Sequence, residues 1–451
     1  MAKIREKTYD LNQIQEEKLS KDLQLENFGW DSKFYKSEPK KITVSSLVKG
    51  FFQMQDRKEN SLESWSFHIG LENQTTVSKQ ALDNRLSPVA VQMVKTIFEF
   101  ALNLKLSKEI EQEKTEQNKR LFSKFNHILI QDSTMQKLPS RLADIFKSSH
   151  SHGKKAATLR LQAIYNFTLE QWVDFDLGGF TDNDQSKAEM IAKVAQPNDL
   201  ILRDLGYFTL DSLEELIAKQ FVITAWDKQS HMYDPQSNQR IDLLELFKGK
   251  TQIDQAVLLG KKKQLPMRLV AKKLPKSIAD KRISEAKKDR HSKTKHSKEY
   301  YKLLQWEIYL TNVEVDTLSI DEVAKLYGLR WYIEIFFKAW KSFAAFKTIL
   351  SKQQMTKERT LISIYLMLIR FVYYMLDFYQ YIQLRITSNS NKQISILKFF
   401  KTCAILSKHL YSIKHFSQID QLIPYFDKYA TYENRKDRDN MQLKYLYFNE
   451  L

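Results

Sequence analysis

Cysteine, glycine and proline are all scarce in this chain of 451 residues. The one cysteine, Cys403, excludes an internal disulfide framework and any zinc site that needs several cysteines. With 10 glycines and 8 prolines, a collagen-like or low-complexity chain is also excluded, and long helices are favoured. Hydrophobic residues make up 43%, which rules out a mostly disordered chain and is enough for a sizeable core. The length predicts about three domains, at roughly 150 residues each.

Acidic residues are too few to balance the basic ones. Lys and Arg number 71 against 54 Asp and Glu, which gives a formal net charge of +17. A surplus of this size predicts a polyanionic partner, either nucleic acid or an anionic membrane surface. Residues 1–10 are polar and charged, which is not typical of a secretory signal.

Long hydrophobic runs are lacking as well. The stretch most similar to a membrane span is residues 361–376, which is short and carries Arg370 near its middle. A span needs about 20 apolar residues, and an arginine at its centre is costly. We therefore expect a buried helix here, no membrane partner, and a soluble intracellular protein that faces nucleic acid.

Residues 1–120 are expected to form a helical, DNA-binding region. A helix over 61–68, Gly70 at its end and a second helix over 77–86 outline a helix-turn-helix near 61–86. Four side chains of the second helix are of types that reach base edges or phosphates: Lys79, Gln80, Asn84 and Arg85. A plain helical hairpin without a role in DNA binding is the alternative.

The pattern changes at about residue 121 to short β-branched runs that alternate with helices. Strands are expected at 127–132, 158–167, 171–176, 200–204 and 221–225, and helices at 187–194 and 210–219. This order predicts an α/β fold, in which helices flank a mixed sheet.

A basic segment interrupts this layer. Residues 261–302 hold 16 Lys or Arg against 4 Asp or Glu. Such a run is commonly a solvated segment, but its place between two elements of the layer also fits an insertion that faces DNA. Strand character returns at 303–313, and a long helix is expected over 320–350.

Three carboxylates stand where a site could form. Asp132 ends the first expected strand, Asp204 ends the fourth, and Glu334 lies in the long helix. Ligand sites gather at strand ends along one edge of an open sheet, and a helix across that edge can add a third acid. Oxygen donors of this kind suit Mg²⁺ or Mn²⁺. Alone the pattern is weak, because acidic residues often end strands.

The long helix presents a polar stripe on one side. Its members are Tyr327, Arg330, Glu334 and Lys341. At about 100° per residue, these four fall within roughly 60° of one another, and the opposite side is aromatic and aliphatic. A surface ion pair between Arg330 and Glu334 is the alternative, and it leaves the position of Tyr327 unexplained.

The spacing of this stripe is Tyr, two residues, Arg, three residues, Glu, six residues, Lys. It resembles the signature of DDE transposases of the insertion-sequence-4 type, and residues 327–334 read Tyr-Gly-Leu-Arg-Trp-Tyr-Ile-Glu. The segments Ile-Gln-Asp-Ser-Thr around Asp132 and Arg-Asp-Leu-Gly-Tyr around Asp204 resemble the two aspartate blocks of that family. The resemblance covers residues 122–350.

This resemblance implies a ribonuclease-H-like catalytic domain between helical N- and C-terminal regions. The first part of that domain would be residues 121–226, and a basic, mostly β insertion would occupy 227–313. Residues 314–352 would complete the domain with the glutamate helix. Residues 353–451 would form the helical C-terminal region, where a dimer interface is expected.

The resemblance also assigns roles within the site. Two divalent ions, Mg²⁺ or Mn²⁺, would be held by Asp132, Asp204 and Glu334. Phosphates near the cut would be contacted by Tyr327, Arg330 and Lys341. In related transposases that form a hairpin at the DNA end, a tryptophan stacks on a flipped base, and Trp306 is the candidate here. The alternative for Trp306 is a tryptophan of the core.

The function implied is that of a DNA transposase. It would bind the terminal inverted repeats of an insertion sequence, cleave the element ends and join the 3′-hydroxyl ends to target DNA. The route would be cut-and-paste, with or without a hairpin intermediate, by a homodimer on double-stranded DNA in the nucleoid of the bacterial cytoplasm. The alternatives are an inactive or regulatory DNA-binding relative, and a ribonuclease-H-like nuclease or resolvase without strand transfer.

Overall fold

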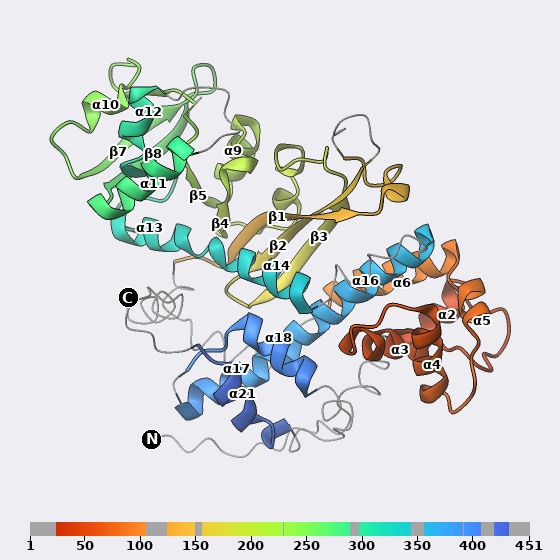
Figure 1. Cartoon of the computed structure of the whole chain (residues 1–451). Coiled ribbons are helices and arrows are strands. Elements are labelled where there is room, and N and C mark those ends of the chain that lie inside the picture. Colours follow the sequence, from red (N-terminus) through yellow and green to blue (C-terminus); the bar gives the residue numbers. More distant parts are fainter. Residues whose placement is uncertain are drawn as a thin grey trace.

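The computed structural model describes residues 24–104, 124–148, 156–228, 230–288, 297–343, 356–390, 392–406 and 419–432. In these ranges helices come first, a sheet with its own helices follows, and helices return near the C-terminal end. Figure 1 shows the sheet in the centre with the N-terminal helices to one side and the C-terminal helices below. The expected α/β fold with helical N- and C-terminal regions is confirmed at this level.

The N-terminal helices are α2 (Leu25–Asp31), α3 (Val44–Asp56), α4 (Leu62–Glu72), α5 (Lys79–Arg85) and α6 (Pro88–Leu102). The last four each follow a Ser or Thr whose hydroxyl accepts a hydrogen bond from a backbone amide of the first turn. Such caps satisfy amides that have no partner within the helix, so the local sequence determines where each helix begins.

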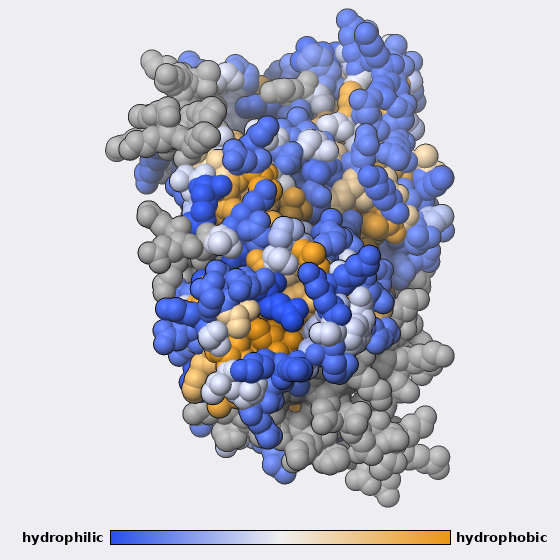
Figure 2. Space-filling view, turned by 90° about the vertical axis from the view of Figure 1, so that its right-hand side faces the viewer, coloured by the Kyte–Doolittle hydropathy of each residue, from blue (hydrophilic) through white to orange (hydrophobic). Residues whose placement is uncertain are grey.

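The α4–α5 pair lies at the place of the expected helix-turn-helix, but Gly70 is not at the helix end, because α4 continues to Glu72. Lys79, Gln80 and Asn84 are exposed on α5 and remain candidates for contact with DNA. Arg85 instead donates to the Phe34 carbonyl at 2.7 Å and lies over the Phe34 ring, so it packs α5 onto the preceding segment. The surface on this side of the molecule is mostly hydrophilic, with separate hydrophobic patches (Figure 2).

The described residues form one nine-stranded mixed sheet in the order β3-β2-β1-β4-β5-β9-β8-β7-β6. The strands are β1 (Ile128–Leu138), β2 (Ala157–Asn166), β3 (Gln171–Gly178), β4 (Leu200–Arg203), β5 (Phe221–Ala225), β6 (Met232–Tyr233), β7 (Gln252–Leu259), β8 (Leu265–Lys273) and β9 (Trp306–Thr311). β4 pairs in parallel with β1 and β5, and the other neighbours are antiparallel. A crossover helix, α9 (Leu210–Ile217), joins the parallel β4 and β5.

Two expectations for this layer are wrong in detail. The first strand does not end at Asp132, because residues 133–138 continue β1 by pairing with β2 in an antiparallel ladder. The helix expected at 187–194 is replaced by two short 3₁₀ turns, η2 (Gln185–Lys187) and η3 (Ile191–Lys193). A short apolar pattern does not by itself distinguish a 3₁₀ turn from an α-helix.

The insertion is not mostly β. Within 227–313, besides β6, β7, β8 and β9, the described residues form α10 (Leu243–Leu246), α11 (Lys276–Lys288) and α12 (Lys298–Leu303). The basic part, residues 261–302, contributes β8, α11 and α12, and Lys, Arg, Glu and Ala favour helix in the last two. Its strands also extend the central sheet, because β8 pairs with β9 and β9 pairs with β5.

The long helix expected over 320–350 is divided into α13 (Ile320–Gly328) and α14 (Trp331–Phe343), and its last residues lie outside the described range. In between, the Arg330 amide donates to the Tyr327 carbonyl and the Ile333 amide to the Arg330 carbonyl. These three-residue spacings define a tight 3₁₀ turn. The two helices follow each other in nearly the same direction along the sheet (Figure 1).

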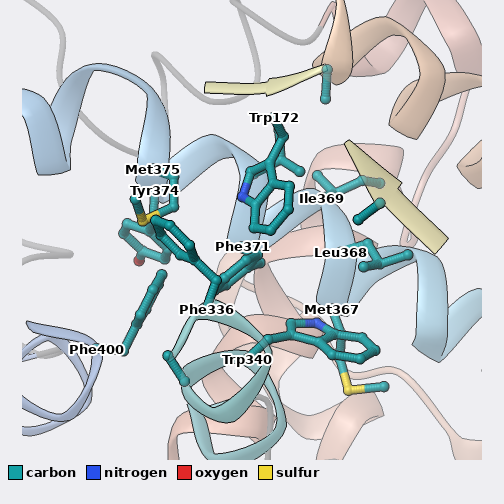
Figure 3. Close-up of a cluster of buried hydrophobic side chains, with 14 of the residues drawn as sticks. Trp172, Phe336, Trp340, Met367, Leu368, Ile369, Phe371, Tyr374, Met375 and Phe400 are labelled. Atoms are coloured by element: carbon teal, nitrogen blue, oxygen red, sulfur yellow. The ribbon is translucent and has the colours of Figure 1, made fainter. Parts of the chain in front are cut away.

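Packing fixes the orientation of α14. Ile128 and Ile130 of β1 belong to the core that α14 shares, whereas Leu129 belongs to the core on the opposite face. Phe336 of α14 packs against Trp172 of β3 and Phe371 of α16, and Trp340 belongs to the same buried cluster (Figure 3). The aromatic side of α14 is therefore inside, as expected, and its polar stripe is left for the edge of the sheet.

The C-terminal helices are α16 (Lys357–Tyr373), the π-helical turn η5 (Tyr374–Phe378), α17 (Tyr379–Ser390), α18 (Ile396–Ile405) and α21 (Ile423–Tyr429). Among the described residues, one helical run, Lys357–Ser390, is long and apolar enough to cross a membrane, and 65% of its most apolar window is buried. Arg370 of this run pairs with Asp56 of α3 at 2.6 Å. The buried helix expected at 361–376 is thus confirmed.

Candidate active site

The register of the sheet brings Asp132 and Asp204 together. The parallel ladder between β1 and β4 ends with Gln131 opposite Arg203, so the next residue along each strand is one of the two aspartates. Alternate side chains of a strand share a face. Asp132 is therefore on the face of Ile130, which is the face that α14 covers.

Arg330 joins these aspartates to Glu334, which lies in the first turn of α14. Arg330 Nη1 donates to Asp132 Oδ2 at 2.9 Å, and Nη2 donates to Glu334 Oε1 at 3.1 Å. Arg330 Nε lies 3.7 Å from Asp204 Oδ1. The Arg330–Glu334 pair exists, but it is one part of a cluster in which three acids from distant segments converge on one guanidinium.

The three acids differ in their access to water. The side chain of Asp132 is 12% exposed, against 32% for Glu334 and 42% for Asp204. Burial raises the pKa of Asp132 to about 7, although the Arg330 guanidinium beside it acts in the opposite direction. One cation among three acids leaves the site short of positive charge.

The chemistry of these donors fits a divalent ion, because carboxylate oxygens are the ligands that Mg²⁺ and Mn²⁺ prefer. Within the described part of the chain, no three Asp, Glu, His or Cys side chains stand close enough together to hold a metal ion as placed. The guanidinium of Arg330 lies between the three acids. Metal binding would therefore require Arg330 to move aside.

The remaining members of the polar stripe flank the acids. Tyr327, at the end of α13, has its ring 4.9 Å from that of Tyr309 in β9, and burial raises the pKa of Tyr327 to about 12. Lys341 Nζ donates to the Met135 carbonyl at 2.8 Å, further along β1 than Asp132. The stripe thus spans the sheet edge, with a phenol on one side of the acids and an ammonium on the other.

Trp306 begins β9 and is 8% exposed. Its ring stacks on Phe247 with 4.3 Å between the ring centroids. Trp306 and Tyr327 also line the same cavity of about 490 Å³, together with Trp226 and Tyr300. The tryptophan therefore has core packing on one side and a cavity beside it, and its role in DNA binding stays a prediction.

Sequence reasoning missed Asp184, which lies in the loop between β3 and β4. Its carboxylate accepts hydrogen bonds from Ser133 of β1 and Arg160 of β2. The local sequence does not distinguish Asp184 from the neighbouring Asp182, and only the pairing of β1 with β2 reveals it. The aromatic cavity wall was missed in the same way, since its residues come from separate segments.

Comparison with known proteins identifies the family. The family model described as "Transposase DDE domain" matches residues 123–369, which is more than half of the chain and includes the three acids, the polar stripe and Trp306. The transposase for insertion sequence element IS231F of Bacillus thuringiensis subsp. israelensis is 29% identical over 289 residues, covering 59% of this chain and 59% of that protein. The transposase for insertion sequence element IS1151 of Clostridium perfringens is 25% identical over 366 residues, covering 76% and 73%. The chain thus spans about three fifths of the length of the first of these relatives.

Among solved structures, the cryo-EM structure of the piggyBac transposase synaptic complex with hairpin DNA covers 94% of this chain and 85% of that chain, with a TM-score of 0.43 and 10% identity. A likeness at that level carries no weight for fold or function. The family model does, because it covers the strands and helices that bring the three acids together. On this match the chain belongs to the transposase DDE domain family.

Proposed function

We propose that this chain is a DNA transposase of the insertion-sequence type, which cleaves the ends of its element and joins the freed 3′-hydroxyls to target DNA. The observation that supports it best is the convergence of Asp132, Asp204 and Glu334 on one guanidinium. The relatives named as insertion-sequence transposases support the same assignment.

In this proposal the three acids hold two divalent ions, Mg²⁺ or Mn²⁺. Two ions bound there would activate the attacking oxygen and stabilise the leaving oxygen of a phosphodiester. The protein itself contributes the placement of three carboxylates at one point on the sheet edge. Asp132 comes from β1, Asp204 directly follows β4, and Glu334 comes from α14. Asp132 is the enclosed acid, while Asp204 and Glu334 remain accessible to solvent and substrate.

Tyr327, Arg330 and Lys341 are assigned to the phosphates near the cut. A guanidinium or ammonium beside a phosphate forms a charge-assisted hydrogen bond, and these contacts dominate affinity for DNA. Arg330 lies among the three acids and Lys341 lies further along β1, at the Met135 carbonyl, so a DNA strand that crosses the acids meets one cation at them and another beside them.

Two finer assignments belong to the proposal. A sheet with three antiparallel strands, β1 to β3, followed by parallel β4 and β5, supports a ribonuclease-H-like arrangement of the catalytic part. The spacing of Tyr327, Arg330, Glu334 and Lys341 supports membership of the insertion-sequence-4 type.

Trp306 is assigned to an extruded base at the transposon end, which would accompany a hairpin intermediate. The aromatic cavity that it lines adjoins Tyr327, and aromatic faces stabilise extruded bases by stacking. Replacing Trp306 by Ala should reduce any hairpin product more than it reduces the first nick.

The partners proposed are the terminal inverted repeats and target DNA, both double-stranded, bound by a homodimer that holds two ends. Exposed apolar side chains in the C-terminal region, Ile405, Tyr425 and Tyr429, support an interface there. Like its bacterial relatives, the protein would act in the cytoplasm, on the DNA of the nucleoid.

The test is cleavage of labelled DNA that carries the terminal inverted repeat of the element, with Mg²⁺ or Mn²⁺, resolved on a denaturing gel. Asp132→Asn and Glu334→Gln should lose the metal-dependent cut. Glu245→Gln, a change to an acid of α10 that is 72% exposed, is the matched control and should cut normally. Specific binding by the wild type without any cut would instead favour an inactive or regulatory relative.

A further inference from the structure

Asp184 is held by side chains from two strands of the catalytic sheet. Its Oδ1 accepts hydrogen bonds from Ser133 Oγ at 2.7 Å, Arg160 Nη1 at 2.9 Å and Gln162 Nε2 at 3.0 Å. Ser133 belongs to β1, and Arg160 and Gln162 belong to β2. An acid that accepts three side-chain donors at one oxygen is far more constrained than an ordinary loop carboxylate.

The same carboxylate lies against the turn that follows Asp204. A Cβ added to Gly206 would lie only 2.7 Å from Asp184 Oδ2, so any larger residue there would press on the Asp184 carboxylate. The next residue, Tyr207, donates its hydroxyl hydrogen bond to Gln162, which itself donates to Asp184. Asp184 is thus coupled to the Asp204 turn by direct packing and through Gln162.

On the other side, Asp184 is coupled to Asp132 through one residue. Ser133 donates its hydroxyl to Asp184 and its backbone amide to Asp132 Oδ1, the latter at 2.7 Å. Fixing the Ser133 side chain therefore fixes the amide that orients the Asp132 carboxylate. Arg160, which is buried, supplies the charge that keeps Asp184 in place.

We propose that Asp184 is a positioning residue of the active site, which sets the separation and orientation of Asp132 and Asp204. It acts through Ser133 and the Gly206 turn. This inference rests on the proposed function, because it assigns Asp184 to the metal-binding geometry of that same site. Residues that orient metal ligands in this indirect way typically change metal affinity about 10- to 100-fold when replaced.

Asp184→Asn is the main test. Asparagine keeps the shape and one acceptor oxygen but loses the charge that Arg160 meets. We expect the Mn²⁺ concentration for half-maximal cleavage to rise about tenfold or more, with DNA affinity in the absence of metal unchanged. Binding of Mn²⁺ to the full chain, followed by electron paramagnetic resonance, should weaken by the same factor.

Asp182→Asn is the matched control. Asp182 lies in the same loop and accepts the Gly179 amide at 2.6 Å, and it has no hydrogen bond to β1 or β2 among the contacts found in the described residues. Its replacement should leave the Mn²⁺ requirement unchanged. Gly206→Ala is the second variant, because it pushes against Asp184 Oδ2 and keeps the charge; it should raise the Mn²⁺ requirement as well.

The outcomes separate the two proposals. If the wild type neither binds Mn²⁺ nor cuts DNA, the proposed function fails. If the wild type does both, and Asp184→Asn and Gly206→Ala match it in Mn²⁺ requirement, Asp184 has no positioning role. A loss of cleavage that no Mn²⁺ concentration restores, with unchanged Mn²⁺ binding, would also overturn the inference.

Discussion

Arg330 and Arg370 are both largely withdrawn from water, but their counter-charges differ. Arg370 is 1% exposed and meets one carboxylate, Asp56, whose side chain is 6% exposed. Its guanidinium also lies over the rings of Phe52 and Tyr374. At this junction between α16 and α3, the guanidinium and the carboxylate that faces it are both buried away from solvent.

At the sheet edge, by contrast, one guanidinium serves three acids. Arg330 is 11% exposed, and two of its partners, Asp204 and Glu334, remain 42% and 32% exposed. Water can replace the arginine at these carboxylates, whereas the buried carboxylate of Asp56 has little access to water. The comparison separates an arginine that holds the fold together from one whose partners can accept another cation.

Removing each arginine tests this contrast directly, and the largest effect is expected at the junction. Arg370→Met removes the cation that faces the buried carboxylate of Asp56 and should lower the free energy of unfolding by about 3–5 kcal/mol. Arg330→Met should cost less, about 1 kcal/mol, because two of its three acids, Asp204 and Glu334, remain within reach of water. Urea unfolding of the full chain measures both, and equal losses would contradict the contrast. The double variant Arg370→Met with Asp56→Leu should recover most of the loss.

A second prediction concerns Lys341, which contacts β1 beyond Asp132. Lys341→Ala should weaken binding to specific and random DNA alike, by about tenfold, and lower the salt dependence by about one phosphate contact. Lys248→Ala is the control, since Lys248 is 75% exposed on the insertion and pairs only weakly, at 3.6 Å, with Glu245. Titrations at several salt concentrations give both quantities. Loss of binding to the specific sequence alone would show that Lys341 reads bases.

The third prediction tests whether Arg330 and a metal ion compete for the same carboxylates. In the protein without DNA, Arg330→Met should bind Mn²⁺ more tightly, by about tenfold, because the guanidinium no longer lies between the acids. The rise in melting temperature on adding Mn²⁺ should therefore be larger for the variant than for the wild type. An equal rise in both proteins would show that Arg330 does not compete with the metal.

The smallest effect is expected from the dependence of folding stability on pH, through His68 in helix α4. Burial, with Arg57 nearby, lowers the pKa of His68 below its usual value of about 6.5. The unfolded chain then binds the proton more readily than the folded chain, so stability falls as the pH drops below about 6.5. His68→Gln should make the loss of stability between pH 7 and pH 5 shallower. An unchanged slope would show that His68 does not contribute to it.

Much of the site could be predicted because several of its elements follow from local patterns in the sequence. The strand pattern predicted β2, β4 and β5 closely, and the spacing of Tyr327, Arg330, Glu334 and Lys341 predicted one helix face. That face survives the 3₁₀ turn at Leu329 and Arg330, since such a turn barely changes the direction of the helix.

The parts that escaped prediction depend on contacts between distant segments. The continuation of β1 beyond Asp132 depends on its hairpin partner, β2, and not on the residues of β1. The same holds for Asp184, which acquires its partners only when β1 and β2 pair. The position of Arg330 among three acids likewise cannot be read from the i,i+4 spacing, which accounts only for Glu334.

The way in which the insertion joins the sheet has a consequence for how this chain can change in evolution. The backbone leaves β5 at Ala225 and returns in β9 with Tyr309 directly opposite. The excursion between them therefore begins and ends at neighbouring points, and neither Asp204 nor Tyr327 lies within it. Evolution can lengthen, shorten or exchange the part of this segment before Trp306 while its two ends stay joined, so contacts outside the reaction centre can be remodelled while Asp204 and Tyr327 keep their places.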